Sequence, residues 1–181
     1  MDETFIGGKA RNMHKHIRAR KVTGTGGKDK TAVIGVLERG SKIRVSVIES
    51  RKRQPLHKHV KENVHPGAEV FTDALKSYEG LDAEYVHQAI DHAVKYVEGQ
   101  VHTNGLDNFW SLLKRTLKGT YTFVEPYHLF RYPDEQAFRY NERKEVNGDF
   151  GRFCQVMQNA TGRRLTYQEL TGKGDATYDR D

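Results

Sequence analysis

The sequence has almost no cysteine and no long hydrophobic run, and both absences exclude classes of protein. Cys154 is the only cysteine among 181 residues, which excludes an internal disulfide and a cysteine-rich zinc site. The longest apolar run, about residues 31–37, is far shorter than the ~20 residues that span a bilayer. The first residues also lack the basic and then apolar pattern of a signal peptide. We therefore expect a cytoplasmic protein that does not enter a membrane.

Charge is what the sequence has in quantity, with basic side chains in excess. Charged residues make up 30% of the chain, and 30 Lys and Arg against 24 Asp and Glu leave a net charge of +6 at pH 7. A net positive charge favours a polyanionic partner such as nucleic acid, although solvated lysines produce the same balance. The length allows one domain, or one domain and a tail, around a real core.

Basic residues are concentrated between positions 9 and 30, where Asp29 is the single acid. Glycines at 24, 26 and 27 interrupt the end of this segment, so we predict a mobile basic loop. Two interpretations stay open: a solvated linker, or an arm that contacts DNA phosphates. The basic residues are Lys9, Arg11, Lys15, Arg18, Arg20, Lys21, Lys28 and Lys30.

The hydrophobic pattern predicts a mixed α/β order of elements. Strands are expected at residues 2–6, 30–38, 42–49, 68–72 and 84–90. Helices are expected at 54–64, 74–78, 104–118 and 126–143, with a loop at 91–102. Gly119 is expected to end the third helix, and Pro133 to kink or split the fourth. We place one domain at 1–147 and a tail at 148–181, whose one amphipathic segment is 164–170.

Carboxylates occupy the expected strands at positions where a crevice forms. Asp2 lies on the first strand and Asp73 directly follows another, and side chains at strand ends converge in open α/β sheets. Two carboxylates held close together repel one another, and a divalent cation such as Mg²⁺ relieves that repulsion. The helix at 104–118 adds Asn104 and Asp107 on the face opposite its apolar stripe. Both are also suited to the start of a helix, as a cap and as a partner of the helix dipole.

Several segments resemble bacterial insertion-sequence transposases of the DDE type, in the subgroup with a DD(E/N/H)K signature. The resemblance covers nearly the whole chain, and the segment HTNGLDNFWSLLKR at 102–115 carries it most specifically. Lys114 lies two helical turns beyond Asp107, as the lysine of that signature requires. The other segments are DETFIGGK at 2–9, TD at 72–73, and residues 127–132, 138–143 and 164–170.

The resemblance implies a ribonuclease H-like α/β fold, a mixed sheet of about five strands flanked by helices, with the basic segment 9–30 inserted after the first strand. It implies DNA strand cleavage and strand transfer with two Mg²⁺ or Mn²⁺ ions. Asp2 and Asp73 would be metal ligands, and Asn104 or Asp107 would complete the site. DNA, both element ends and target, is the implied partner, and a homodimer or co-assembly with a full-length transposase is open. The implied DNA contacts are Lys114, Arg115, Lys118 and the basic residues Lys9, Arg11, Lys15, Arg18, Arg20 and Lys21.

Three departures from the family pattern define the alternatives. Asp107 stands where a glutamate is usual and is one methylene shorter, so we rank Asn104 slightly above it as third ligand. Pro133 stands where a leucine is expected, and the sequence does not contain the family's N-terminal DNA-binding region. We therefore expect a truncated or decaying copy. The alternatives are an inert remnant that only binds DNA or co-assembles, and a ribonuclease H-like nuclease without strand transfer.

Overall fold

The computed structural model describes residues 1–8, 10–22, 24, 29–73, 75–90, 104–121 and 124–171. The chain divides into two compact units, Met1–Asn141 and Glu142–Asp181, whereas the sequence analysis placed a boundary at 147. Lys9, Lys28 and the loop predicted at 91–102 lie outside the described residues.

A three-stranded antiparallel sheet forms the centre of the first unit, in the order β1-β2-β3. It consists of β1 (Asp2–Ile6), β2 (Thr31–Leu37) and β3 (Ile43–Ile48), and all three predicted strands are confirmed to within a residue. The register of β1 and β2 sets Asp2 opposite Gly35. Gly40 adopts a φ of 71° in the turn between β2 and β3, a conformation that glycine adopts without strain.

A second sheet pairs β4 (Glu69–Asp73) with β5 (Val86–Ile90) in parallel, and Asp73 is the last residue of its strand. The Met1 amino group donates a 2.5 Å hydrogen bond to the Phe71 carbonyl, which brings the start of β1 beside β4. The mixed α/β class is thus confirmed. The resemblance implied a single mixed sheet of about five strands. The strand pairing instead forms two sheets, because β4 and β5 pair only with each other.

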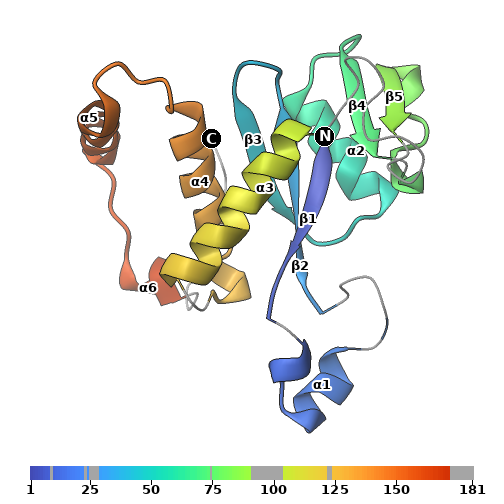
Figure 1. The fold of residues 1–181 in the computed structure, drawn as a ribbon, viewed down its shortest axis with the longest axis horizontal. Helices are drawn as coiled ribbons and strands as arrows, with labels where there is room; N and C mark the ends of the chain where they lie inside the picture. The colour runs from blue at the N-terminus through green and yellow to red at the C-terminus, as the bar shows by residue number, and fades with distance from the viewer. Residues whose placement is uncertain are drawn as a thin grey trace. The chain divides into compact units, whose positions relative to one another are not determined.

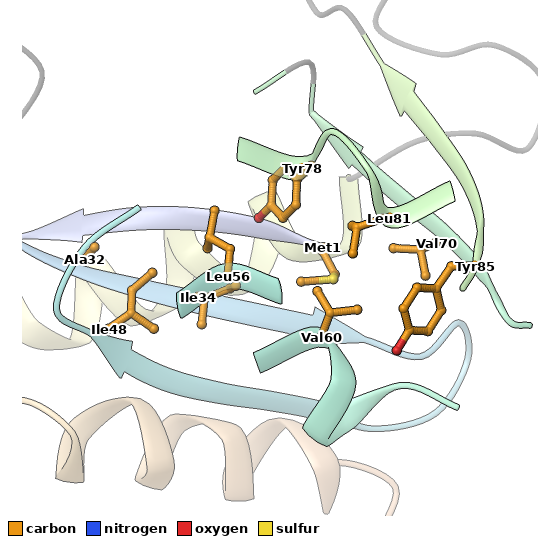
Figure 2. Close-up of a cluster of buried hydrophobic side chains, with 10 residues drawn as sticks. All are labelled: Met1, Ala32, Ile34, Ile48, Leu56, Val60, Val70, Tyr78, Leu81 and Tyr85. Carbon is orange, nitrogen blue, oxygen red and sulfur yellow. The ribbon is translucent and has the colours of Figure 1, made fainter. Parts of the chain in front are cut away.

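Two apolar clusters lie on the two faces of the antiparallel sheet, because alternate residues of a strand point to opposite sides. One cluster joins Ala32, Ile34 and Ile48 of the sheet to Leu56 and Val60 of α2 (Arg53–Asn63) (Figure 2). The other joins the opposite face to α3 (Asn104–Thr116) and α4 (Arg131–Asn141). Figure 1 shows these two helices beside the sheet. Its fully buried or nearly buried members are Val33, Ile43, Val45, Leu106, Phe109, Trp110, Leu113, Leu117, Leu129 and Ala137.

The helix α3 (Asn104–Thr116) buries the predicted stripe, including Leu106, Phe109 and Leu113. The prediction that Gly119 ends it was wrong, because the chain continues in a wider π-helical turn, Leu117–Tyr121. Leu117 is buried and the Tyr121 ring packs edge-on against Tyr132, so this turn is held by tertiary contacts.

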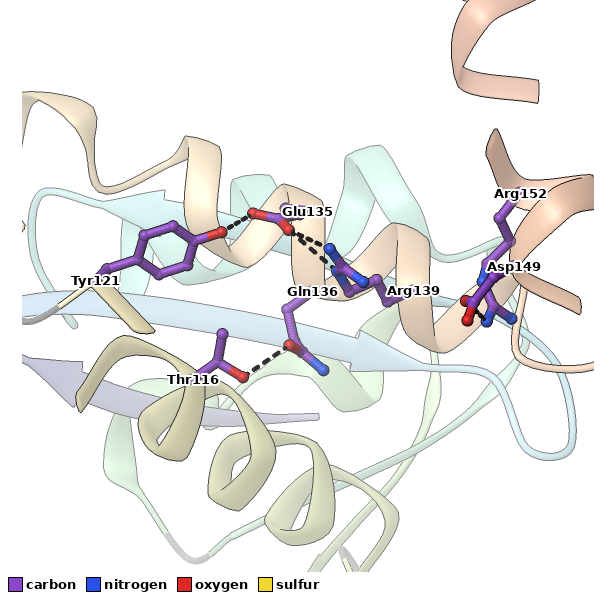
Figure 3. A network of polar contacts seen from close by, with 7 residues as sticks. All are labelled: Thr116, Tyr121, Glu135, Gln136, Arg139, Asp149 and Arg152. Carbon is purple, nitrogen blue, oxygen red and sulfur yellow. Dashed lines mark hydrogen bonds and ion pairs between the residues drawn. The ribbon is translucent and has the colours of Figure 1, made fainter. Parts of the chain in front are cut away.

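The helix α4 (Arg131–Asn141) packs beside α3, and Pro133 neither kinks nor splits it. Pro133 lies in the first turn, where a backbone N–H has no partner within the helix, so its missing donor costs little. The predicted helix is divided earlier, between the 3-10 helix Pro126–His128 and α4. Polar contacts join α3 and its π-helical turn to α4. Thr116 donates to Gln136, and Tyr121 donates to Glu135, which also pairs with Arg139 (Figure 3).

Two other helices differ from the sequence-based expectation. The basic segment contains a 3-10 turn, Ala10–Asn12, and the helix α1 (Lys15–Lys21), so it is not a loop throughout. The tail contains α5 (Gly148–Ala160), which was not predicted, and the short α6 (Tyr167–Thr171). In α5, Asp149 of the first turn pairs with Arg152, and the helix forms despite Gly148 and Gly151 (Figure 3). Within the described residues, no helix has the length and apolar character needed to cross a membrane.

Candidate metal centre

Three acidic side chains meet where β1 begins and β4 ends. Asp2, Glu3 and Asp73 each offer a carboxylate oxygen, and these three oxygens all lie within 4.8 Å of one another. All three side chains are half-buried. Asp2 and Asp73 thus come together, as expected for side chains at strand ends, and their role as metal ligands stays a prediction. Glu3 was not among the expected site residues.

Neighbouring elements hold each carboxylate by a hydrogen bond. The indole Nε1 of Trp110 on α3 donates to Asp2 Oδ2 at 2.9 Å. The hydroxyl of Tyr78, in the 3-10 helix Lys76–Tyr78, donates to Glu3 Oε1 at 2.6 Å. Asp73 Oδ1 accepts from the backbone N–H of Leu75 at 3.3 Å. Asp2 and Glu3 are therefore anchored from opposite faces of the sheet, because Trp110 and Tyr78 belong to the two different clusters.

A buried hydrogen-bonded pair, Thr72 and His87, lies beside Asp73. Thr72 is fully buried, and its hydroxyl lies 2.8 Å from His87 Nε2 on β5 and 2.8 Å from the Asp73 carbonyl. The other ring nitrogen of His87 lies 3.3 Å from Asp82 in the 3-10 helix Leu81–Ala83. This contact ties β4 to β5 at the residue before Asp73.

The electrostatics of the site disfavour three ionised carboxylates without a cation. Burial raises the pKa of Glu3 to about 7, and the charges of Asp73 and Asp2 add to the rise. Burial also raises the pKa of Asp2, with the charges of Asp73 and Asp107 adding to it and the Trp110 hydrogen bond opposing it. Burial, followed by the Glu3 charge, raises the pKa of the Tyr78 hydroxyl, which therefore stays a donor.

The site has the composition that a hard divalent cation prefers. Among the ion pairs of the described part of the chain, none involves Asp2, Glu3 or Asp73. Arg51 lies near enough to lower the pKa of Glu3, but as the last and smallest of the contributions. Clustered carboxylate oxygens without a paired cation fit Mg²⁺ or Mn²⁺, both of which take oxygen ligands.

The two candidates for the third ligand begin α3. Asn104 is the first residue of that helix, and both Asn104 and Asp107 are exposed. Asp107 lies outside the group of three carboxylates, although its charge contributes to the raised pKa of Asp2. The choice between Asn104 and Asp107 therefore stays a prediction, to which Glu3 is added.

The expected DNA contacts are exposed wherever the structure describes them. Lys114, Arg115 and Lys118 lie at the C-terminal end of α3 and in the turn that follows. In the inserted segment, the expected contacts that the structure describes are all exposed: Arg11, Lys15, Arg18, Arg20 and Lys21.

Glu3, Tyr78 and Trp110 are the site residues that the sequence analysis missed. A strand pattern places Asp2 and Glu3 on opposite faces, so it argues against their sharing a site. Trp110 belongs to the apolar stripe of α3 and is assigned to the core on that ground. A signal for it does exist, because Gly35 interrupts an otherwise β-branched and apolar strand, and such a glycine marks a close approach by another group.

Comparisons with known proteins agree with the resemblance to insertion-sequence transposases, and the DDE subgroup stays a prediction. Residues 1–141 match the model of the ISXO2-like transposase domain. This range coincides with the first compact unit. The chain is also 31% identical over 101 residues to an uncharacterized transposase-like protein from Haemophilus influenzae; the match covers 55% of this chain and 81% of that protein. No solved structure matches the chain significantly.

Proposed function

Because this chain belongs to the ISXO2-like transposase domain family, we propose that it catalyses metal-dependent DNA strand cleavage and strand transfer. The observation that carries the proposal is the meeting of Asp2, Glu3 and Asp73, whose oxygens lie within 4.8 Å of one another. Asp73 is far from the other two in sequence and belongs to the other sheet, so their meeting is a property of the fold. Half-buried acids without a paired cation cost stability, and a cation site gives a reason for keeping them.

The proposed fold is ribonuclease H-like, with the two sheets forming one continuous sheet in which β1 lies next to β4. The hydrogen bond from Met1 to Phe71 aligns the start of β1 with β4 and supports a strand order of β3-β2-β1-β4-β5. In that order β1 and β4 are neighbours at the centre, and their carboxylates meet at one edge. The helices α2 and α3 cover opposite faces, which is the layering that an α/β sheet requires.

In the proposed site, Asp2 and Asp73 hold the metal ions, with Glu3 and either Asn104 or Asp107 completing the ligand set. Divalent ions bound there would supply the charge that activates an attacking oxygen and stabilises a leaving oxygen in phosphoryl transfer. The chain's own contribution is to hold the carboxylates in place through Trp110, Tyr78 and the Leu75 amide. A fixed ligand geometry lowers the reorganisation that metal binding requires.

The proposed DNA contacts come from two exposed basic regions. Lys114, Arg115 and Lys118 follow the same helix that carries Trp110 and Asp107, so DNA bound along α3 leads toward the carboxylates. The basic helix α1 supplies further cations after β1. Both regions are solvent-accessible and carry the long side chains that contact phosphates.

The test uses the purified chain and a supercoiled plasmid that carries the DNA flanking the coding sequence. We expect nicking with Mg²⁺ or Mn²⁺ that EDTA abolishes, and loss of nicking in Asp2→Asn and Asp73→Asn. Asp149→Asn, an exposed acid of α5, is the matched control and should nick normally. Nicking that survives both site substitutions would contradict the proposal.

Strand transfer needs a second measurement, because nicking alone is also what a simple nuclease does. A labelled duplex with a pre-cut 3′-hydroxyl at the element end should become joined to the plasmid. Joining supports a transposase, whereas nicking without joining supports a nuclease. Binding of DNA without either reaction supports an inert remnant.

A further inference from the structure

Trp110 is the only tryptophan of the chain, and its polar edge meets the candidate metal centre. The side chain is 4% exposed, and its Nε1 donates a 2.9 Å hydrogen bond to Asp2 Oδ2. The two residues are 108 positions apart in sequence. A tryptophan that only fills a core needs some acceptor for its N–H, but here the acceptor is a carboxylate of the site.

The fold makes room for this contact at Gly35. Gly35 is the partner of Asp2 across the β1–β2 pair, so the two share one face of the sheet. A Cβ atom at Gly35 would lie 2.8 Å from Trp110 Cζ2 and 2.9 Å from Leu106 Cδ2, closer than such atoms approach. The indole therefore lies over the glycine backbone, and only a residue without a side chain lets it reach Asp2.

A second neighbour fixes the plane of the indole. Phe109 packs edge-on against Trp110, with ring centroids 5.2 Å apart and an interplanar angle of 69°. Phe109 is fully buried, so the contact is rigid on the time-average. The donor direction of Nε1 is thus set by packing, and it points to Asp2.

We propose that Trp110 is a positioning residue that holds the Asp2 carboxylate in the orientation that binds the metal. The inference rests on the proposed function, because it assigns a role toward the same site. Asp2 is repelled by Asp73 and Asp107, and a free carboxylate would rotate away from them. The indole N–H engages one carboxylate oxygen and opposes that rotation. Groups that orient metal ligands in this way change metal affinity about 10–100-fold when they are removed.

The test compares Mn²⁺ binding, measured by electron paramagnetic resonance, in the full chain and two variants. Trp110→Phe keeps an aromatic ring on α3 but removes the donor, and we expect Mn²⁺ affinity to fall about 10–100-fold. Leu129→Ala is the matched control, since it removes a buried side chain of the same apolar cluster at a position outside α3. It should lose stability in thermal unfolding and keep its Mn²⁺ affinity.

A second readout keeps the inference testable if Trp110→Phe folds poorly. Because Trp110 is the single tryptophan, its fluorescence reports on the Asp2 carboxylate in the unmodified chain. Titration with Mg²⁺ should change the emission with saturation, and Asp2→Asn should abolish the change. Gly35→Ala should weaken Mn²⁺ binding too, because the added methyl group displaces the indole.

The outcomes separate the two proposals. If the unmodified chain binds no Mn²⁺, the metal centre itself is wrong and the inference falls with it. If the unmodified chain binds Mn²⁺ and Trp110→Phe binds it equally well, the metal centre stands and the positioning role is refuted. Mn²⁺ binding without a Mg²⁺-dependent change in Trp110 emission would likewise refute the positioning role alone.

Discussion

Asn141, the last residue of α4, forms both backbone hydrogen bonds of Ile43 at the start of β3. Its Oδ1 accepts from the Ile43 N–H at 2.7 Å, and its Nδ2 donates to the Ile43 carbonyl at 3.0 Å. The side-chain amide thus takes the place of a neighbouring strand at the open edge of the sheet. Asn141 is also the last residue of the first compact unit and of the family match.

We predict that Asn141→Ala lowers the free energy of unfolding by about 2–3 kcal/mol. The substitution removes two hydrogen bonds and leaves the partly buried N–H and carbonyl of Ile43 without their partners. Asn141→Asp should cost less, since a carboxylate still accepts from the N–H. Asn159→Ala, which removes an exposed hydrogen bond within α5, is the control. Urea unfolding monitored by circular dichroism measures the three variants, and equal destabilisation by Asn141→Ala and Asn159→Ala would refute the edge-strand role.

The raised pKa of Glu3 predicts that the stability of the fold depends on pH. Its pKa is raised from 4.5 to about 7, so ionising it in the folded state costs free energy. That cost is absent below pH 4.5, grows between pH 4.5 and 7, and is complete above pH 7. Glu3→Gln should therefore be more stable than the unmodified chain at pH 8, by up to about 3 kcal/mol, and close to it at pH 4.5. The amide oxygen can still accept from Tyr78.

Urea unfolding at pH 4.5 and 8 without divalent cations measures this difference. Glu62→Gln, an exposed residue paired with Lys58 on α2, is the matched control and should show no comparable pH-dependent gain. An equal effect of Glu3→Gln at both pH values would contradict the raised pKa. Mg²⁺ should stabilise the unmodified chain more at pH 8 than at pH 4.5, since only the ionised site attracts it.

The third ligand is tested by substitutions at the start of α3. Asn104→Ala should abolish Mg²⁺-dependent nicking if its amide is the ligand, while costing only about 1 kcal/mol of stability if it merely supports the helix start. Asn108→Ala, an exposed neighbour on the same helix, should remain active. A fully active Asn104→Ala protein would reverse the ranking of Asn104 over Asp107. Asp107→Glu should raise activity if Asp107 is a ligand of too short a reach.

The basic helix α1 should make DNA binding sensitive to salt. Replacing Arg18, Arg20 and Lys21 with alanine should flatten the slope of log affinity against log salt by up to about 0.9 for each DNA phosphate that is no longer neutralised. Fluorescence anisotropy with a labelled duplex measures the slope. Alanine at Lys42, Lys52 and Lys58, which are also exposed, removes the same charge and is the control. If both triple variants keep the original slope, α1 does not contact DNA phosphates and the basic segment is a solvated linker.

The sequence by itself determined the local elements and the positions of the two aspartates. The apolar spacing of Leu106, Phe109 and Leu113 determines α3, because a 3.6-residue period puts them on one face. The hairpin of β2 and β3 follows from two apolar runs around a glycine turn, and Asp73 ends its strand as predicted. These features depend on residues close together in the chain, so a local pattern suffices.

Helix ends and the tail were predicted less well, because tertiary contacts override local preferences there. Gly119 is a helix terminator by local preference, but Leu117 and Tyr121 are anchored against other elements on either side of it. Pro133 is a helix breaker only inside a helix, and the position of the first turn of α4 is not visible in the local pattern. Gly148 and Gly151 concealed α5 in the same way.

The tertiary structure alone decided which side chains share the site. Asp2 and Glu3 are neighbours on a strand and start from opposite faces, yet oxygens of both come within 4.8 Å of Asp73. Trp110 belongs to an apolar stripe, and only the gap over Gly35 turns its N–H toward Asp2. Contacts between residues 70 or 108 positions apart depend on how the sheets and α3 pack, and no local period encodes that packing.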